Sequence, residues 1–547
     1  MTPELILTGG IVRTVDRDHP VAEALAIGGG RILAVGSESD VLALRGPETE
    51  VRDLAGLAVY PGFVDVHTHH EVAGITDLFE LSFSPSLTID EVLDLVRARA
   101  STLPEDAWIT GGSYAATLLN ELNSTAVRER LDEAAGGRPV MLSEDSRHNR
   151  WVNTRALELA GITRDAIPAE GVTLVDPVDG EPSGVLLEAA GIPVVQAYER
   201  DGGLTPEQHR QASRRGIELL GTFGVTAFQD AAVSFEILEA LRSLDEAGEL
   251  NAWVVSSLTV NDDIFGFDPV GIPLVEGGEP YRTEHHRPDF VKIFLDGVPP
   301  ARTACFVHPY LPDDEHGDAF TGTTTMTPDE LHGWLRLVAE RGLGAKVHCT
   351  GDGSAHLLLD TVARLRDEGF TDTAFQIAHG QYLTDEDIAR MAPLGVAADL
   401  SPFIWFPGVI PQALAAVLGD ERAARLQPNR ALLDAGALIA GGSDWPVSES
   451  PNPFEGMQGL VTRADPLERA PGVLWPEQAI TAEEALEAFT IGAATAMGLH
   501  DEIGSLEVGK SADFVIVDRD FVAGDPHGII HTRVIETWFA GRRVFTA

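Results

Sequence analysis

The chain has 547 residues and a formal charge of -46 at pH 7, and a surface dominated by carboxylates excludes nucleic acid and anionic membranes as partners. With 44% hydrophobic and 23% charged residues, the composition excludes a disordered chain and indicates a globular protein that acts on a small molecule. Two cysteines, Cys305 and Cys349, exclude a disulfide framework or a thiolate zinc cluster.

The two ends of the chain carry short alternating segments that are punctuated by glycine. Leu5–Val12, Ala24–Val35 and Val51–Val59 predict β-hairpins, as do Asp513–Val517 and Val534–Val544. A turn-glycine pattern shared by the two ends predicts that they pair into one small β-sandwich. The start lacks a signal sequence and no segment approaches 18 uninterrupted apolar residues, so we expect a cytoplasmic protein.

Between the ends, apolar strands alternate with helices that begin at capping boxes. The four boxes are Thr88 with Glu91, Thr205 with Gln208, Thr327 with Glu330, and Thr481 with Glu484. The predicted strands are Phe63–His67, Val225–Asp230, Ala252–Leu258, Phe290–Asp296, Ala345–His348, Ala374–His379, Val396–Leu400 and Leu438–Asp444. Eight strands that are apolar on both faces predict an α/β fold with a closed (β/α)8 TIM barrel.

The spacing of these elements predicts three parts. A long stretch separates the first two barrel strands, far more than one βα unit needs, so we expect a subdomain inserted at 72–200. The barrel is expected to comprise 61–71 and 201–499, and the β-sandwich 1–60 and 500–547.

Five residues at predicted strand ends have the chemistry of a metal site. His67 and His69 lie two residues apart on the first strand, so both imidazoles face the same side. Alone, this pair is weak evidence for a metal site, because 17 histidines give roughly 0.5 such pairs by chance. His348, His379 and Asp444 each end a different strand, on the face where barrel active sites are built. Together they predict divalent metal ligands, because imidazole and carboxylate are usual partners of zinc.

Lys292 lies within the apolar strand Phe290–Asp296. A buried ammonium is costly unless it is paired, so this lysine either becomes neutral or forms a salt bridge. A neutral lysine can react with carbon dioxide, and the resulting carbamate could bridge two metal ions. The alternative is a salt bridge to Asp230 or Asp296.

These residues lie in segments that resemble a known family. Tyr60–His69, Gly441–Pro446 and Gly504–Val517 resemble the first-strand, eighth-strand and β-sandwich motifs of the amidohydrolase superfamily. Within the superfamily, the segments Val291–Gly297, His348–Asp352 and His148–Asn153 resemble the branch of amidohydrolase family 3 that contains N-substituted formamide deformylases. The resemblance covers essentially the whole chain. It implies a carboxylated Lys292 and two divalent metal ions, with zinc as the expected metal.

The expected reaction is hydrolysis of an amide-type C–N bond, such as an N-formyl or N-acyl bond. A hydroxide that bridges the two metals would attack the carbonyl, while Asp444 would accept the proton and pass it to the leaving amine. His148 would stabilise the oxyanion or hold the substrate. After the seventh strand, Phe403, Trp405 and Phe406 either contact a hydrophobic or aryl substituent or pack in the core.

Several alternatives remain open at this point. An esterase, lactonase or cyclic-imide hydrolase would use the same site, and a mononuclear enzyme would keep a plain lysine. A non-catalytic metal-binding protein is a further alternative. The pairs Cys349-Thr350 and Ser146-Arg147 depart from the pattern of the relatives, so the natural substrate stays open, as do the metal used and a homo-oligomeric state.

Overall fold

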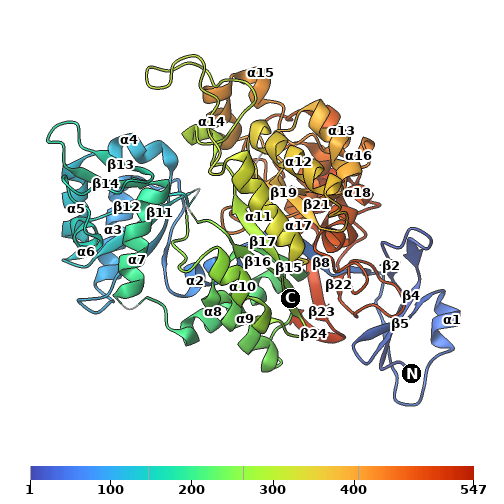
Figure 1. The fold of residues 1–547 in the computed structure, drawn as a ribbon. Coiled ribbons are helices and arrows are strands. Elements are labelled where there is room, and N and C mark those ends of the chain that lie inside the picture. Colours follow the sequence, from blue (N-terminus) through green and yellow to red (C-terminus); the bar gives the residue numbers. More distant parts are fainter. Residues whose placement is uncertain (1, 146, 202, 263, 405) are drawn as a thin grey trace.

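The computed structural model describes residues 2–145, 147–201, 203–262, 264–404 and 406–547. These residues form a mixed α/β fold, in which an eight-stranded parallel sheet occupies the centre (Figure 1). In pairing order its strands are β8 (Phe63–Thr68), β15 (Val225–Val233), β16 (Trp253–Thr259), β17 (His286–Phe294), β18 (Gly344–His348), β19 (Phe375–His379), β20 (Val396–Leu400) and β21 (Ile439–Gly441). Each overlaps a predicted strand, which confirms the eight-stranded arrangement.

The sheet curls into a nearly closed barrel. Thr68, at the end of β8, forms a parallel bridge with Trp445, which follows β21. The backbone N–H of Asp444 also donates to the carbonyl of His67 at 2.7 Å, and that of His69 donates to Trp445 at 2.8 Å. The residues that follow the eighth strand therefore reach the first strand, close to the predicted ligands.

Helices surround the barrel in Figure 1. They include α2 (His70–Leu78), α8 (Pro206–Thr222), α9 (Phe235–Glu246), α11 (Pro328–Glu340), α12 (Asp352–Asp367), α13 (Asp385–Leu394), α17 (Pro453–Thr462) and α18 (Ala482–Glu487). The predicted capping boxes are all present, at α8, α11 and α18 and at α3 (Ile89–Ala100), which lies outside the barrel. In each box the threonine hydroxyl accepts from the backbone N–H three residues later, which satisfies a donor that the first helical turn leaves unpaired. No helix in the described part of the chain is long and apolar enough to cross a bilayer.

The ends of the chain form two further sheets, and one of them combines strands from both ends. One has the order β24 (Arg542–Thr546), β23 (Val534–Phe539), β22 (Phe514–Val517), β7 (Ala58–Pro61), β2 (Ile11–Arg13) and β3 (Val21–Ala22). The other has the order β5 (Arg31–Gly36), β4 (Ala24–Gly28), β1 (Leu5–Thr8) and β6 (Glu50–Asp53). Apolar side chains from the two sheets, such as Leu7, Ile27 and Phe514, share one buried cluster.

Two of the five predicted hairpins are confirmed, because β4 pairs with β5 and β23 pairs with β24. The other three are wrong: β1 and β2 belong to different sheets, as do β6 and β7, and β22 is a single strand. Gly9 has φ +68°, and a Cβ at Gly10 would lie 2.4 Å from the carbonyl oxygen of Leu57. These glycines let the chain cross from one sheet to the other, whereas a hairpin would have kept it in the same sheet.

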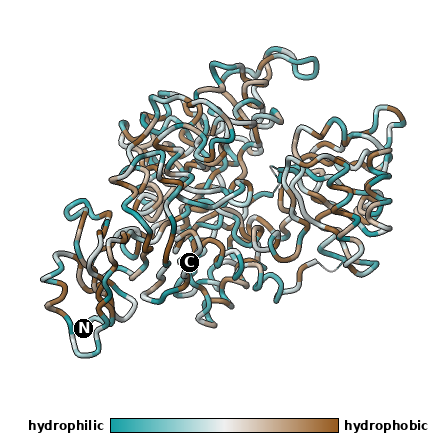
Figure 2. The backbone as a smooth tube through the Cα atoms, turned by 180° about the vertical axis from the view of Figure 1, so that it is seen from behind, coloured by the Kyte–Doolittle hydropathy of each residue, from teal (hydrophilic) through white to brown (hydrophobic). Residues whose placement is uncertain are grey.

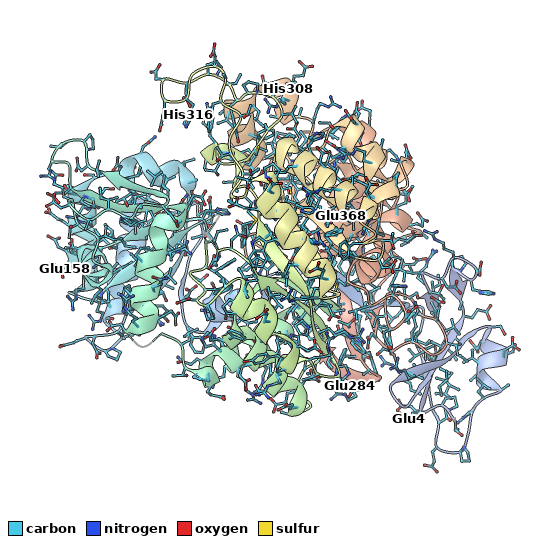
Figure 3. All side chains as sticks on the ribbon, in the orientation of Figure 1. Glu4, Glu158, Glu284, His308, His316 and Glu368 are labelled. Carbon is cyan, nitrogen blue, oxygen red and sulfur yellow. The ribbon has the colours of Figure 1, made fainter. Side chains whose placement is uncertain are left out.

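Between β8 and β15 the chain forms a separate sheet with its own core. Its order is β13 (Val172–Val175), β14 (Pro182–Leu187), β12 (Asn149–Val152), β11 (Val140–Glu144), β10 (Ile109–Tyr114) and β9 (Leu81–Ser82). The helices α3, α5 (Thr125–Ala135), α6 (Thr154–Ala160) and α7 (Ile192–Arg200) lie beside it at one side of the barrel in Figure 1. Figure 2 shows apolar segments within this part as well as within the barrel. Exposed acids such as Glu158 here, Glu284 near the barrel and Glu4 at the N-terminus spread the negative charge over all three parts (Figure 3).

Helices α2 and α8 pack closely because each carries a glycine at the contact. A Cβ at Gly74 would lie 1.9 Å from the carbonyl oxygen of Ala212, and one at Gly216 would lie 2.1 Å from that of His70. His70 follows directly after His69 and holds Asp230 on β15, with Nδ1 2.5 Å from the carboxylate. This contact therefore fixes the start of α2, beside a predicted metal ligand.

We expect Gly216→Ala to lower the free energy of unfolding by about 1–3 kcal/mol, since the methyl group would force α8 away from α2. The matched control is Gly333→Ala on α11, where nothing lies within 4 Å of an added Cβ. That substitution should raise stability by about 0.5–1 kcal/mol, because alanine loses less entropy in a helix. Denaturant unfolding of both variants measures the effects. A Gly216→Ala protein as stable as wild type would show that the contact is not tight.

Candidate metal centre

His67, His69 and Asp444 form a compact cluster at the carboxyl end of the barrel. Their ligand atoms all lie within 4.8 Å of one another, and Oδ1 of Asp444 is 3.5 Å from Nε2 of both histidines. All three side chains are buried. Nε2 of His67 and Nδ1 of His69 have no hydrogen-bond partner among the described residues, although an unpaired buried nitrogen is costly. A divalent metal ion fits this donor set.

The structure brings His348 and His379 into the same cluster. Nε2 of His379 lies 3.1 Å from Nδ1 of His348, and the His67 and His379 rings are 4.7 Å apart between centroids. Oδ2 of Asp444 is 3.9 Å from Nδ1 of His379. Burial lowers the pKa of His67, His348 and His379 well below the usual value. These imidazoles are therefore neutral, which is the form that binds metals.

Two members of the cluster have an unusual backbone. His379 has φ 73° and Asp444 has φ 57°, in the left-handed region that residues other than glycine seldom adopt. Tertiary hydrogen bonds hold both: the Gln427 side chain donates to the His379 carbonyl at 2.7 Å, and the Asp444 N–H donates to the His67 carbonyl at 2.7 Å. Such strain is common at functional sites, where the surrounding structure maintains it.

Lys292 is buried on β17 and forms no ion pair with Asp230 or Asp296, so the salt-bridge alternative is wrong. The carboxylate of Asp230 binds His70. That of Asp296 accepts from the hydroxyl of Ser354 at 2.6 Å and from backbone N–H groups. Burial, followed by the charge of Lys346, lowers the pKa of Lys292 to about 7. A large fraction of this lysine is therefore neutral near pH 7, as carbamate formation requires.

Lys346 and Asp399, which were not among the predicted site residues, also belong to this region. Nζ of Lys346 lies 2.5 Å from Oδ2 of Asp399, and the same oxygen is 2.7 Å from Nδ1 of His67. Lys346 precedes His348 by two residues and is the register neighbour of Lys292 on the adjacent strand. Strand alternation could therefore have placed it in the barrel interior.

His148 reaches the cluster from the part of the chain between β8 and β15. Its ring centroid lies 6.4 Å from that of His348, and its Nδ1 is 2.7 Å from Oε2 of Glu188. Burial alone would lower the pKa of His148, but the Glu188 carboxylate outweighs it and the pKa is raised. Glu188 follows β14, and no sequence pattern marked it.

An aromatic group that was not among the predicted site residues lies beside His69. The Phe265 ring, in the loop after β16, is 5.1 Å from the His69 ring and is stacked on Phe267, also at 5.1 Å. Phe406 is buried, and a Cβ at Gly459 would lie 1.9 Å from its ring. Trp405 lies outside the described residues, so its predicted contact with substrate stays a prediction.

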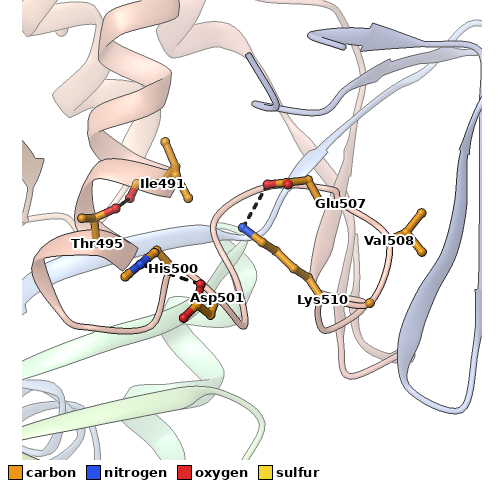
Figure 4. A pocket seen from close by; sticks show the side chains of 8 residues that line it. Ile491, Thr495, His500, Asp501, Glu507, Val508 and Lys510 are labelled. Atoms are coloured by element: carbon orange, nitrogen blue, oxygen red, sulfur yellow. Dashed lines mark hydrogen bonds and ion pairs between the residues drawn. The ribbon is translucent and has the colours of Figure 1, made fainter. Parts of the chain in front are cut away.

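The hollow in Figure 4 lies elsewhere on the molecule. It is lined by Ile491, Thr495, His500, Asp501, Glu507, Val508, Gly509 and Lys510. Thr495 also lines a neighbouring hollow beside Phe375 and Val396, where β19 and β20 begin. This is the end of the barrel opposite to the cluster. Because barrel active sites form at the carboxyl ends of the strands, we exclude this hollow as the candidate site.

Several known proteins are similar to this chain over nearly its whole length. Residues 50–545 match the sequence model of the Amidohydrolase family. The N-substituted formamide deformylase of Arthrobacter pascens is 29% identical over 98% of this chain and 97% of its own length. Protein LONG AFTER FAR-RED 3 of Arabidopsis thaliana is 28% identical over 99% of this chain and 91% of its own.

Solved structures share the fold. An uncharacterized metal-dependent hydrolase from Pyrococcus horikoshii superposes with a TM-score of 0.75 at 21% identity, over 95% of this chain and 99% of its own. A zinc complex of atrazine chlorohydrolase from Arthrobacter aurescens gives 0.55 at 18% identity, over 98% and 94% respectively. Since the family description matches nearly the whole sequence, the chain belongs to the amidohydrolase family.

Proposed function

We propose that this protein is a metal-dependent hydrolase that cleaves an amide-type C–N bond, with an N-formyl or N-acyl compound as substrate. The observation that carries the proposal is the buried His67–His69–Asp444 cluster, whose unpaired nitrogens lie at the mouth of the barrel. Similarity to an N-substituted formamide deformylase supports the N-formyl alternative. An esterase, lactonase or cyclic-imide hydrolase would use the same residues.

Six residues would hold two divalent ions, for which zinc is the proposed metal: His67, His69, Lys292 as its carbamate, His348, His379 and Asp444. When bound, the ions would supply an activated water molecule and polarise the substrate carbonyl. The carboxylate of Asp444 accepts the proton of the attacking water and passes it to the leaving nitrogen. His148, held by Glu188, donates a hydrogen bond to the developing oxyanion. Phe265, with Trp405 and Phe406, contacts an apolar substituent.

The proposed division of the chain follows from the same elements. Residues 61–71 and 201–499 form the catalytic barrel, and residues 72–200 form an inserted subdomain that supplies His148. Residues 1–60 and 500–547 form a supporting β-sandwich. The pairing of β22 with β7 and the separate sheet between β8 and β15 support this division.

Removal of the metal should abolish hydrolysis of an N-formyl amine. We expect the rate to fall by more than about 100-fold after dialysis against a chelator and to return with added zinc. This loss is larger than the loss caused by replacing a residue that only holds a metal ligand in place. Elemental analysis should find two ions per chain, whereas one ion would support the mononuclear alternative. A metal-free protein that keeps its rate would contradict metal dependence. Parallel assays with an ester, a lactone and a cyclic imide identify the bond that is cleaved.

A further inference from the structure

We propose that Lys346 is a positioning residue for the metal site, and that it acts through Asp399 to hold the His67 ring. The inference depends on the proposed metal site but not on the identity of the substrate. It concerns two residues that are outside the six proposed ligands.

The three side chains form a continuous chain of contacts inside the barrel. Oδ2 of Asp399 lies 2.5 Å from Nζ of Lys346 and 2.7 Å from Nδ1 of His67. All three side chains are fully or almost fully buried. They come from β18, β20 and β8, none of which is paired directly with another of the three. Backbone pairing does not directly connect these three strands. Lys346 and Asp399 therefore reach His67 only through side-chain contacts across the barrel interior.

This contact determines which nitrogen of His67 faces the site. Oδ2 of Asp399 faces both Nζ of Lys346 and Nδ1 of His67, and a carboxylate oxygen shared in this way accepts from both nitrogens. Nε2 then carries the lone pair that a metal requires. Nε2 is buried without a hydrogen-bond partner in the described part of the chain, and it lies 3.5 Å from Oδ1 of Asp444. Histidines that bind metals commonly donate their other nitrogen to a carboxylate in this way.

The two buried lysines differ in their surroundings. Lys292 and Lys346 are register neighbours on β17 and β18, but only Lys346 is within ion-pair distance of a carboxylate among the described residues. Lys292 instead places its Nζ 4.7 Å from the centre of the Phe294 ring. Nζ of Lys346 is thus engaged with Asp399, while Lys292 is left for the proposed metal site.

The competing explanation is that Lys346 and Asp399 form an ion pair that only stabilises the fold. A double substitution separates this explanation from a role in positioning His67. Removing one partner alone would leave a buried charge and could prevent folding. Lys346→Met/Asp399→Leu removes both charges together and should fold, because apolar residues of similar volume often replace a buried ion pair at little cost. It also removes the acceptor of His67.

The affinity for Zn²⁺ is measured by titrating the metal-free protein against a chromophoric chelator. We expect the double variant to bind zinc 10–100-fold more weakly than wild type and to change the visible spectrum of the cobalt form. The matched control is Gln376→Met, the register neighbour of Lys346 on β19, whose side chain binds Gln229 and the Ala496 carbonyl. Its zinc affinity should equal that of wild type.

A folded double variant with wild-type zinc affinity would overturn the inference and leave the proposed function intact. A wild-type protein that binds zinc but hydrolyses no amide would refute the proposed reaction, while the zinc affinities would still decide this inference. If the double variant does not fold, nitrogen-15 NMR of histidine-labelled, zinc-loaded wild type decides. Protonated Nδ1 and metal-bound Nε2 at His67 support the inference, and the opposite arrangement overturns it.

Discussion

Replacing Lys292 with alanine should reduce the rate of hydrolysis of an N-formyl amine by more than about 100-fold. This exceeds the loss expected when a residue that only hydrogen-bonds to a metal ligand is removed. Lys292 is buried without an ion-pair partner among the described residues, and burial lowers its pKa to about 7. A carbamate on its nitrogen would supply two oxygens to the metal ions, and an alanine methyl group supplies none. We expect kcat to fall and the zinc content to drop below two ions per chain.

The chain has only two other lysines, Lys346 and Lys510, and Lys510 provides the matched control. Lys510 lies at the far end of the barrel, where its Nζ is 3.0 Å from Glu507 (Figure 4). Lys510→Ala should therefore keep the full rate and both ions. Native mass spectrometry should detect one added carbon dioxide in wild type and Lys510→Ala, and none in Lys292→Ala. A Lys292→Ala protein with both ions and the wild-type rate would disprove the binuclear carbamate model.

The barrel could be predicted because each of its strands is a local apolar run. The terminal sheets could be predicted only in part. Where a strand pairs with its neighbour in sequence, as in β4 and β5, the turn glycines were sufficient. Where the chain changes sheets at Gly9 and Gly10, the partner strands lie far away in sequence, and β7 pairs with β22 from the opposite end of the chain.

The positions of the candidate ligands followed from strand ends, but their environment did not. Lys346 lies two residues before His348, so alternation alone could have placed its side chain in the interior. Its partner Asp399 could not be assigned, because the contact joins strands that are not neighbours. The left-handed backbone of His379 and Asp444 depends on tertiary hydrogen bonds that no local pattern reveals. Phe265 lies in a loop after β16, and loop conformation is set by the parts packed around it.

Asp444→Asn should lower kcat by about 10²–10⁴-fold, the usual contribution of a positioned proton acceptor. Asparagine keeps the size of the side chain and one oxygen, but it cannot take the proton of the attacking water. It also tolerates the left-handed backbone that Asp444 adopts, so the loop should keep its shape. KM should change little, because Asp444 is not among the groups proposed to bind the substituent.

Asp245→Asn is the control for replacing a hydrogen-bonded, half-buried carboxylate with an amide. Asp245 lies on α9, where it accepts hydrogen bonds from Thr283 and His285. That variant should lose stability and keep its kcat. Metal analysis of Asp444→Asn then separates the two proposed roles, because loss of an ion indicates a ligand and a slow enzyme with both ions indicates a proton acceptor. A variant with both ions and the wild-type kcat would assign the proton transfer to another group.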